Sequence, residues 1–204
     1  MSAERISSLF QRFLDVSHKQ TSLRYLFKWV CISTLIGLFA GTGAIVFSLA
    51  IHYVTAFSLG QLLGYLPPEP AGEGSAKVIS FWNTARPWLL PVITTAGGLL
   101  SGIFVFRAAP EAEGHGTDAA IRSIHQGKPI RARVPLVKLL ASAITIGSGG
   151  SAGREGPAAQ ISAGFGSLLS DWFHLDEHDR RIAMAAGLGA GIGAIFRAPL
   201  GGQF

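Results

Sequence analysis

Residues 147–157 read Gly-Ser-Gly-Gly-Ser-Ala-Gly-Arg-Glu-Gly-Pro and separate two short apolar stretches, 134–146 and 157–169. Each stretch opens with a proline, Pro135 or Pro157, which suits the first turn of a helix. As helices they would extend only about 20 Å, too short to cross a bilayer. Lipid cannot satisfy free backbone groups, so such a break persists only inside protein or beside a water-filled cavity. The stretch therefore predicts broken helices around an ion or substrate site.

The composition indicates a membrane protein. Of the 204 residues, 49% are apolar and 14% are charged, whereas a soluble domain usually carries about a quarter charged residues. The 26 glycines fit closely packed membrane helices. Cys31 is the single cysteine of the sequence, which excludes a disulfide within the chain.

Two long apolar runs predict membrane-crossing helices. The first, residues 25–59, contains no proline and as a helix would extend about 50 Å, so it must tilt or project beyond the lipid. The second, residues 87–106, is long enough to span. Between them, the proline- and glycine-rich residues 60–86 predict a loop. Residues 170–181 are expected to be a polar connection, and the small-residue segment 181–204 carries glycines at GxxxG spacing.

The basic residues predict the orientation of the chain. They gather before the first run and after the second, and the segment between has only Lys77 and Arg86. The positive-inside rule then predicts a cytoplasmic N-terminus, an external loop over residues 60–86 and a cytoplasmic segment over 107–133. No base-stacking aromatics are interleaved with the basic residues, so the net charge of +5 does not indicate nucleic acid binding.

Residues 1–24 are expected to form a cytoplasmic amphipathic helix, separate from the transmembrane region over residues 25–204. Apolar side chains recur in them at helical spacing. They lack the apolar core and small-residue cleavage site of a secretory signal peptide.

Arg154 and Glu155 are the charged residues of the glycine-rich break. Ionisable groups at membrane depth are costly and indicate function. The free N–H groups at a helix start form an anion site, which a carboxylate can occupy until protonation releases it. The alternative is an Arg154–Glu155 pair that only caps the helix. No Gly-Lys-Ser/Thr follows the glycines, so a nucleotide site is not expected.

Several motifs, in order, resemble those of the CLC chloride channel and chloride/proton exchanger family. Residues 153–157, Gly-Arg-Glu-Gly-Pro, resemble the family's G-K/R-E-G-P motif. Residues 114–118, Gly-His-Gly-Thr-Asp, stand in the place of G-S-G-I-P, and residues 196–201 resemble its A-F-x-A-P-L-A/G turn. Lys138 stands where the family often has a lysine. The resemblance extends over nearly the whole of residues 25–204.

The resemblance implies an all-α, polytopic membrane fold and a non-enzymatic function, the passage of chloride or a similar anion. Glu155 would be the gate and proton acceptor, with Arg154 and the amides around Gly156 at the outer anion site. His115 and Gly116 would lie toward the inner site. In the family the whole protein has two inverted repeats of tilted, broken helices and forms a homodimer, so this chain would be the first repeat. A bacterial inner membrane is expected, with no cofactor or metal.

Two departures from the family pattern leave questions open. His115 replaces a serine whose hydroxyl contacts the anion, and its ring either faces the anion or turns away, leaving the Gly116 and Thr117 amides to bind. The family's internal proton-relay glutamate would fall beyond Phe204, so the sequence does not separate a channel from an exchanger.

Residues 174–178, His-Leu-Asp-Glu-His, provide a competing hypothesis. They fit the H-x-x-E-H pattern of zinc peptidases. That motif needs a helix with both histidines on one face and a third ligand. Asp176 instead suits a helix N-cap, with Asp179 three residues later. The sequence therefore favours transport over zinc chemistry.

Overall fold

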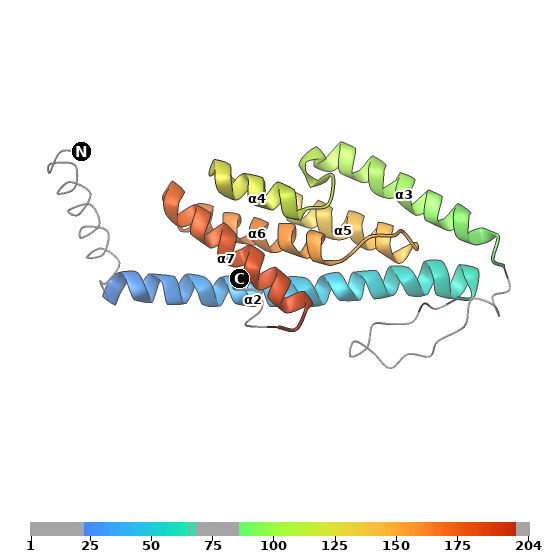
Figure 1. Ribbon diagram of the computed structural model, residues 1–204, viewed down its shortest axis with the longest axis horizontal. Helices are drawn as coiled ribbons and strands as arrows, with labels where there is room; N and C mark the ends of the chain where they lie inside the picture. The colour runs from blue at the N-terminus through green and yellow to red at the C-terminus, as the bar shows by residue number, and fades with distance from the viewer. Residues whose placement is uncertain (1–22, 66, 68–85, 199–204) are drawn as a thin grey trace, which may run out of the picture. The chain divides into compact units, whose positions relative to one another are not determined.

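The computed structural model describes residues 23–65, 67 and 86–198 (Figure 1). Every regular element in these ranges is a helix, which agrees with the all-α prediction. The elements are α2 (Leu23–Thr55), η1 (Ala56–Leu63), α3 (Leu89–Ala108), η3 (Pro110–Ala112), α4 (Thr117–Gln126), α5 (Arg133–Gly147), α6 (Glu155–Trp172) and α7 (Glu177–Ile195). The amphipathic helix predicted in residues 1–24 and most of the predicted external loop lie outside the described residues.

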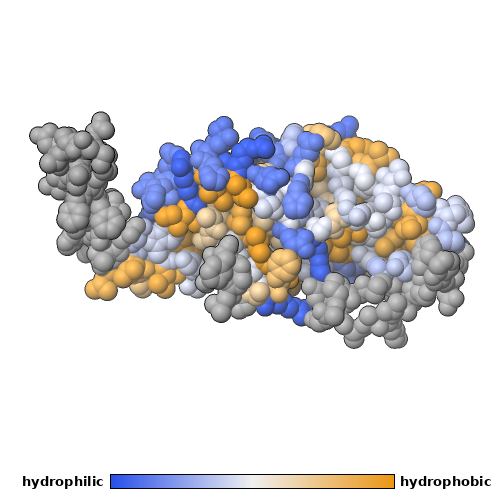
Figure 2. Space-filling model, viewed as in Figure 1, coloured by the Kyte–Doolittle hydropathy of each residue, from blue (hydrophilic) through white to orange (hydrophobic). Residues whose placement is uncertain are grey.

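Two of these helices are long and apolar enough to cross a membrane. They cover Tyr25–Leu63, where α2 continues into the π-helix η1, and Leu89–Ala108, which is α3. In α3, only 11% of the apolar stretch long enough to cross a membrane is buried. Figure 2, drawn in the same view as Figure 1, shows hydrophobic side chains at the surface where α3 lies. An exposed apolar face suits a helix surrounded by lipid. The two long runs predicted from the sequence are therefore confirmed as helices, but the first continues to Leu63, into the predicted loop, and ends at Gly64, whose φ is +76°.

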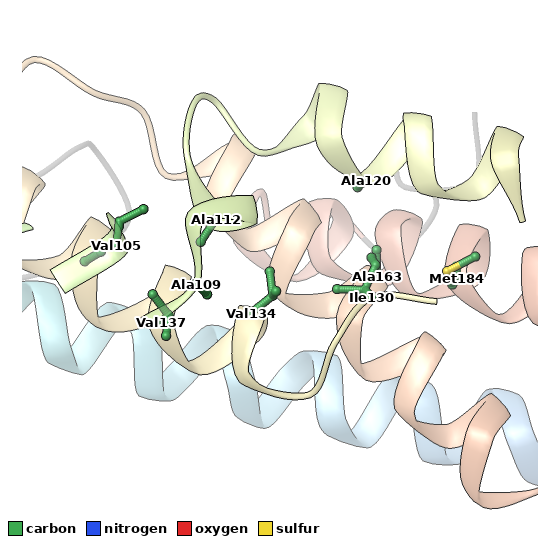
Figure 3. Close-up of a cluster of buried hydrophobic side chains, with 10 residues drawn as sticks. Val105, Ala109, Ala112, Ala120, Ile130, Val134, Val137, Ala163 and Met184 are labelled. Atoms are coloured by element: carbon green, nitrogen blue, oxygen red, sulfur yellow. The ribbon is translucent and has the colours of Figure 1, made fainter. Parts of the chain in front are cut away.

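The chain divides into two compact units, residues 1–35 and residues 36–204. Within the second unit, α5, α6 and α7 lie side by side, and α4 packs against α6 and α7 (Figure 1). Figure 3 shows the buried cluster of this unit, made largely of alanine and valine side chains from several helices. Small side chains let the helix backbones come close together.

Glycines make the α6–α7 contact especially close. A Cβ on Gly191 would lie 2.7 Å from the Cβ of Ser162 and 2.8 Å from the carbonyl oxygen of Ala158. A Cβ on Gly187 would collide with the carbonyl oxygen of Ser162. The GxxxG spacing therefore places glycines against the neighbouring helix, as the sequence indicated.

The region after α6 differs from the prediction. The polar connection expected over residues 170–181 is short, because α6 continues to Trp172 and α7 begins at Glu177. Ser170 lies within α6, where its buried hydroxyl donates to the carbonyl of Gly166 at 2.7 Å. The predicted N-cap is confirmed, since Asp176 accepts a hydrogen bond from the Asp179 amide at 2.8 Å.

Candidate functional site

The glycine-rich break between α5 and α6 is held by hydroxyl groups from two other helices. Ser58 Oγ in η1 donates to the carbonyl of Gly147 at 2.5 Å, and Thr94 Oγ1 in α3 donates to the carbonyl of Ser148 at 3.1 Å. The chain turns at Gly149, whose φ is +91°. These bonds satisfy carbonyls left open where α5 ends, as a break surrounded by packed helices requires.

Glu155 is the first residue of α6, and Arg154 is the N-cap. The sequence had placed Glu155 inside the break, with the helix beginning at Pro157, so α6 starts two residues earlier than predicted. This is possible because the first turn needs no intrahelical N–H partners and proline is tolerated there. The carboxylate turns back over the break, where a Cβ on Gly153 would collide with its Oε2 and lie 3.4 Å from its Cδ.

The second predicted motif forms the loop that leads into α4. Gly114 and Gly116 have φ angles of +79° and +104°, a region in which a side chain would be strained. Gly116 is the N-cap of α4, and Thr117 is its first residue. Gly127, with a φ of +64°, ends the helix after Gln126, as a glycine that adopts the left-handed conformation often does.

The starts of α4 and α6 meet at glycines. A Cβ on Gly116 would lie 2.6 Å from the carbonyl oxygen of Gly156. A Cβ on Gly156 would collide with the carbonyl oxygen of His115 and lie 2.8 Å from its Nδ1. The structure therefore brings together His115, Gly116 and Gly156, with Glu155 beside them in the chain. The starts of α4 and α6 are thus in contact, and the first N–H groups of a helix, which have no intrahelical partner, attract anions.

Two buried side chains hold the loop before α4. Lys138 Nζ, from α5, donates to the carbonyls of Ala112 at 3.0 Å and Gly114 at 2.5 Å. Gln160 Nε2, from α6, donates to the carbonyl of Glu111 at 3.1 Å. Lys138 was a candidate only through the family resemblance, and Gln160 was missed in the sequence. The signal that could have identified Gln160 is its large polar side chain among the mostly small and apolar residues of α6.

Glu111 also anchors this loop through its side chain, which forms an ion pair with Arg131. The hydrogen bond from the Arg131 guanidinium lowers the pKa of the Glu111 carboxyl. Both side chains are about half exposed, so the pair contributes at most about 1 kcal/mol to stability. The loop is thus fixed at its start by a surface pair and along its length by buried donors.

The zinc-peptidase motif does not assemble. His174 precedes α7 with a φ of +50°, whereas Glu177 and His178 lie in the helix. Glu177 is engaged by Arg181. The described part of the chain holds no group of three His, Cys, Asp or Glu side chains placed to bind a metal ion.

The third predicted motif is described only in part. Phe196 follows α7 and Arg197 has a φ of +51°. Residues 199–204, which complete the motif, lie outside the described residues.

The sequence matches the model of the family described as voltage gated chloride channel over residues 97–204. An H(+)/Cl(-) exchange transporter ClcA of Cronobacter sakazakii is 33% identical over 175 residues, which are 84% of this chain and 34% of that protein. A chloride/fluoride channel protein of Pseudomonas syringae pv. tomato is 27% identical over 183 residues, 88% of this chain and 34% of that protein. This chain therefore spans about a third of the length of these curated relatives.

A solved structure, that of a slow cyanobacterial Cl-/H+ antiporter, superposes with a TM-score of 0.67 at 27% identity, over 84% of this chain and 37% of that one. The predicted all-α, membrane-embedded fold is confirmed by this match and by the helices described above.

Proposed function

Because this chain belongs to the voltage-gated chloride channel family, we propose that the protein carrying it moves chloride or a similar anion across a membrane. The observation that supports this most directly is the meeting of two helix starts at Gly116 and Gly156, with Glu155 at the first position of α6. Convergent N–H groups bind an anion without a cation or cofactor. The family is one of channels and transporters, which favours transport over catalysis.

Glu155 is the gate in this proposal. Its carboxylate sits at the positive end of α6 and turns back over Gly153, so it is a tethered anion in competition with chloride. Protonation removes its charge and frees the place for the diffusing anion. Arg154 and the Gly156 amide then support the outer site, and His115 with Gly116 lies toward the inner site. A proton is therefore a second substrate or a gating ligand.

Residues 25–204 act as the first inverted repeat of the transmembrane domain, with a second repeat completing the anion path. The chain's basic segments support a cytoplasmic N-terminus, by the positive-inside rule, in a bacterial inner membrane surrounded by lipid. The working protein is a homodimer, as in the family that the sequence resembles.

The test uses the full-length protein that carries this sequence, purified into liposomes loaded with chloride. Chloride efflux, with the membrane potential set by a potassium gradient and a potassium ionophore, should exceed that of empty liposomes. Proton movement recorded in the same vesicles separates the two modes, because an exchanger drives protons against their gradient and a channel does not. Vesicles that release no chloride, bromide or nitrate above the empty control would refute the proposed function.

A further inference from the structure

The last carbonyls of α5 are satisfied in two different ways. Those of Ile144 and Ile146 accept hydrogen bonds from backbone amides of the glycine-rich break itself, at 3.0 Å. The carbonyls of residues 147 and 148 accept instead from the hydroxyls of Ser58 in η1 and Thr94 in α3. The course of the break therefore depends on two side chains that come from other helices.

Ser58 is buried where η1 packs against the end of α5. It is 6% exposed, and its hydroxyl lies 2.5 Å from the carbonyl oxygen of Gly147 and 2.7 Å from that of Val54. A hydroxyl has one hydrogen to donate, and Gly147 is the nearer acceptor. A Cβ on Gly147 would lie 2.6 Å from the Cβ of Val54, so no side chain fits between the two segments. η1 is a π-helix, a rare form that occurs frequently at functional sites.

Thr94 holds the next residue of the break. Its hydroxyl donates to the carbonyl of Ser148 at 3.1 Å. A Cβ on Gly149 would lie 3.3 Å from Thr94 Oγ1 in α3 and 3.7 Å from Leu59 Cδ2 in η1. The turn at Gly149 therefore lies against both of the elements that supply the hydroxyls.

The fixed part of the break leads to the resting place of the Glu155 carboxylate. The amide of Gly150 donates to the carbonyl of Thr145, and the amide of Ala152 donates to the carbonyl of Gly150, both at 2.9 Å. The next residue is Gly153, and Glu155 Oε2 lies where its Cβ would be. A series of hydrogen bonds thus connects the end of α5 to the neighbour of the residue that receives the carboxylate.

We propose that Ser58 and Thr94 are positioning residues for the gate. Their hydroxyls hold the break in the place where the ionised Glu155 carboxylate closes the anion path. Loss of either hydroxyl leaves a carbonyl unpaired, and the break shifts to find another donor for it. The ionised carboxylate is then held less well, so it gains its proton and opens the path at a higher pH. This inference rests on the proposed function, because it assigns two residues to the gate of that same site.

The measurement is chloride efflux between pH 4.5 and pH 8.5 from liposomes that contain the full-length protein. Ser58→Ala and Thr94→Val each remove one hydroxyl, and the second substitution also keeps the shape of the side chain. Each should raise the pH at which efflux is half its maximum by at least about 0.5 unit. The charged and titratable groups near the gate are the same in all these proteins; they are Arg154, His115, Asp118 and Lys138.

Ser167→Ala is the matched control. This buried hydroxyl also joins two segments, because it accepts from the Ile130 amide at 2.9 Å, but it lies near the other end of α6. Its loss should lower the unfolding temperature, as the loss of Ser58 does, without moving the midpoint of efflux. A purely structural role of Ser58 and Thr94 would give the same pattern as Ser167→Ala.

A midpoint equal to that of the parent in either variant would overturn the proposal, and Thr94→Val decides it alone if Ser58→Ala fails to fold. In a Glu155→Gln background neither substitution should alter efflux at pH 7.5, because no carboxylate remains to be positioned. An equal rise in efflux with and without the carboxylate would also overturn the proposal. A parent protein that releases no chloride at any pH contradicts the proposed function instead.

Discussion

The imidazole of His115 lies against the α-carbon of Gly156, so that a Cβ on this glycine would come within 2.8 Å of Nδ1 and 2.9 Å of Cε1. The contact joins the loop before α4 to the first turn of α6. The ring remains exposed, so it sits at the edge of the site and not within the core. A histidine in place of the family's serine is therefore accommodated beside the helix start that bears Glu155.

Glu155→Gln should keep anion flux and abolish proton coupling and the gating of that flux by pH, leaving only a smaller dependence that comes from other groups, because a neutral amide imitates the protonated carboxyl and cannot act as a tethered anion. The measurement is chloride efflux from liposomes between pH 4.5 and pH 7.5, with proton movement recorded in parallel. Glu177→Gln is the matched control, since that carboxylate pairs with Arg181 at the surface of α7. If Glu155→Gln responded to pH as the parent does, the gate would lie elsewhere.

Gly153→Ala should alter the gate while changing stability little. The new Cβ would occupy the place of Glu155 Oε2, the end of a flexible side chain that can move away. The free energy of unfolding should stay within about 1 kcal/mol of the parent, while chloride flux at pH 7.5 rises because the carboxylate is displaced. In a Glu155→Ala background nothing is left to displace, so the added methyl group should have no effect. An equal effect in both backgrounds would contradict this explanation.

Gly156→Ala should weaken chloride binding and destabilise the protein by about 1–3 kcal/mol, as overpacking does. Its Cβ meets a backbone carbonyl of His115, which cannot move unless the two helix starts separate. Gly98→Ala in α3 is the control, because a Cβ there meets nothing within 4 Å and alanine favours a helix by up to about 1 kcal/mol. Thermal unfolding in detergent and calorimetry with chloride provide the two readouts. If the two variants had equal unfolding temperatures and equal chloride affinities, the contact of Gly156 with His115 would matter neither for stability nor for chloride binding.

His115→Ser should flatten the pH dependence of anion affinity. A protonated imidazole at the edge of the site attracts an anion a few ångströms away, so affinity should rise as the pH falls through the range in which histidine gains its charge. Calorimetry at pH 5 and pH 8 in a Glu155→Gln background removes the competing carboxylate, and Arg154 and Lys138 are common to the two proteins compared. The substitution should also shift the preference among chloride, bromide and nitrate. The same pH dependence with serine would show that the ring does not act on the anion.

The sequence by itself determined the features that depend on local backbone chemistry. The break follows from glycines that turn the chain, as Gly149 does. The limits of α4 and the start of α7 follow from Gly127 and Asp176, which satisfy helix ends within a few residues. The long helices follow from apolar runs that lipid or protein must cover. Glu155 and His115 could likewise be selected as candidates from their motifs, because each motif is a short, continuous stretch of the chain.

Tertiary structure alone decided how these parts meet. Gln160 and the carbonyl of Glu111 are 49 residues apart in the chain, and the contact of His115 with Gly156 likewise joins different helices. The exact start of α6 at Glu155 was also missed, because first-turn N–H groups need no partner and therefore leave no local signal. Contacts of this kind depend on how closely two backbones approach, which is set by the absence of side chains at glycines on separate elements. The GxxxG spacing of one segment indicated that α7 approaches a neighbour closely, but a pattern within one segment does not tell which other element a glycine such as Gly116 or Gly156 meets.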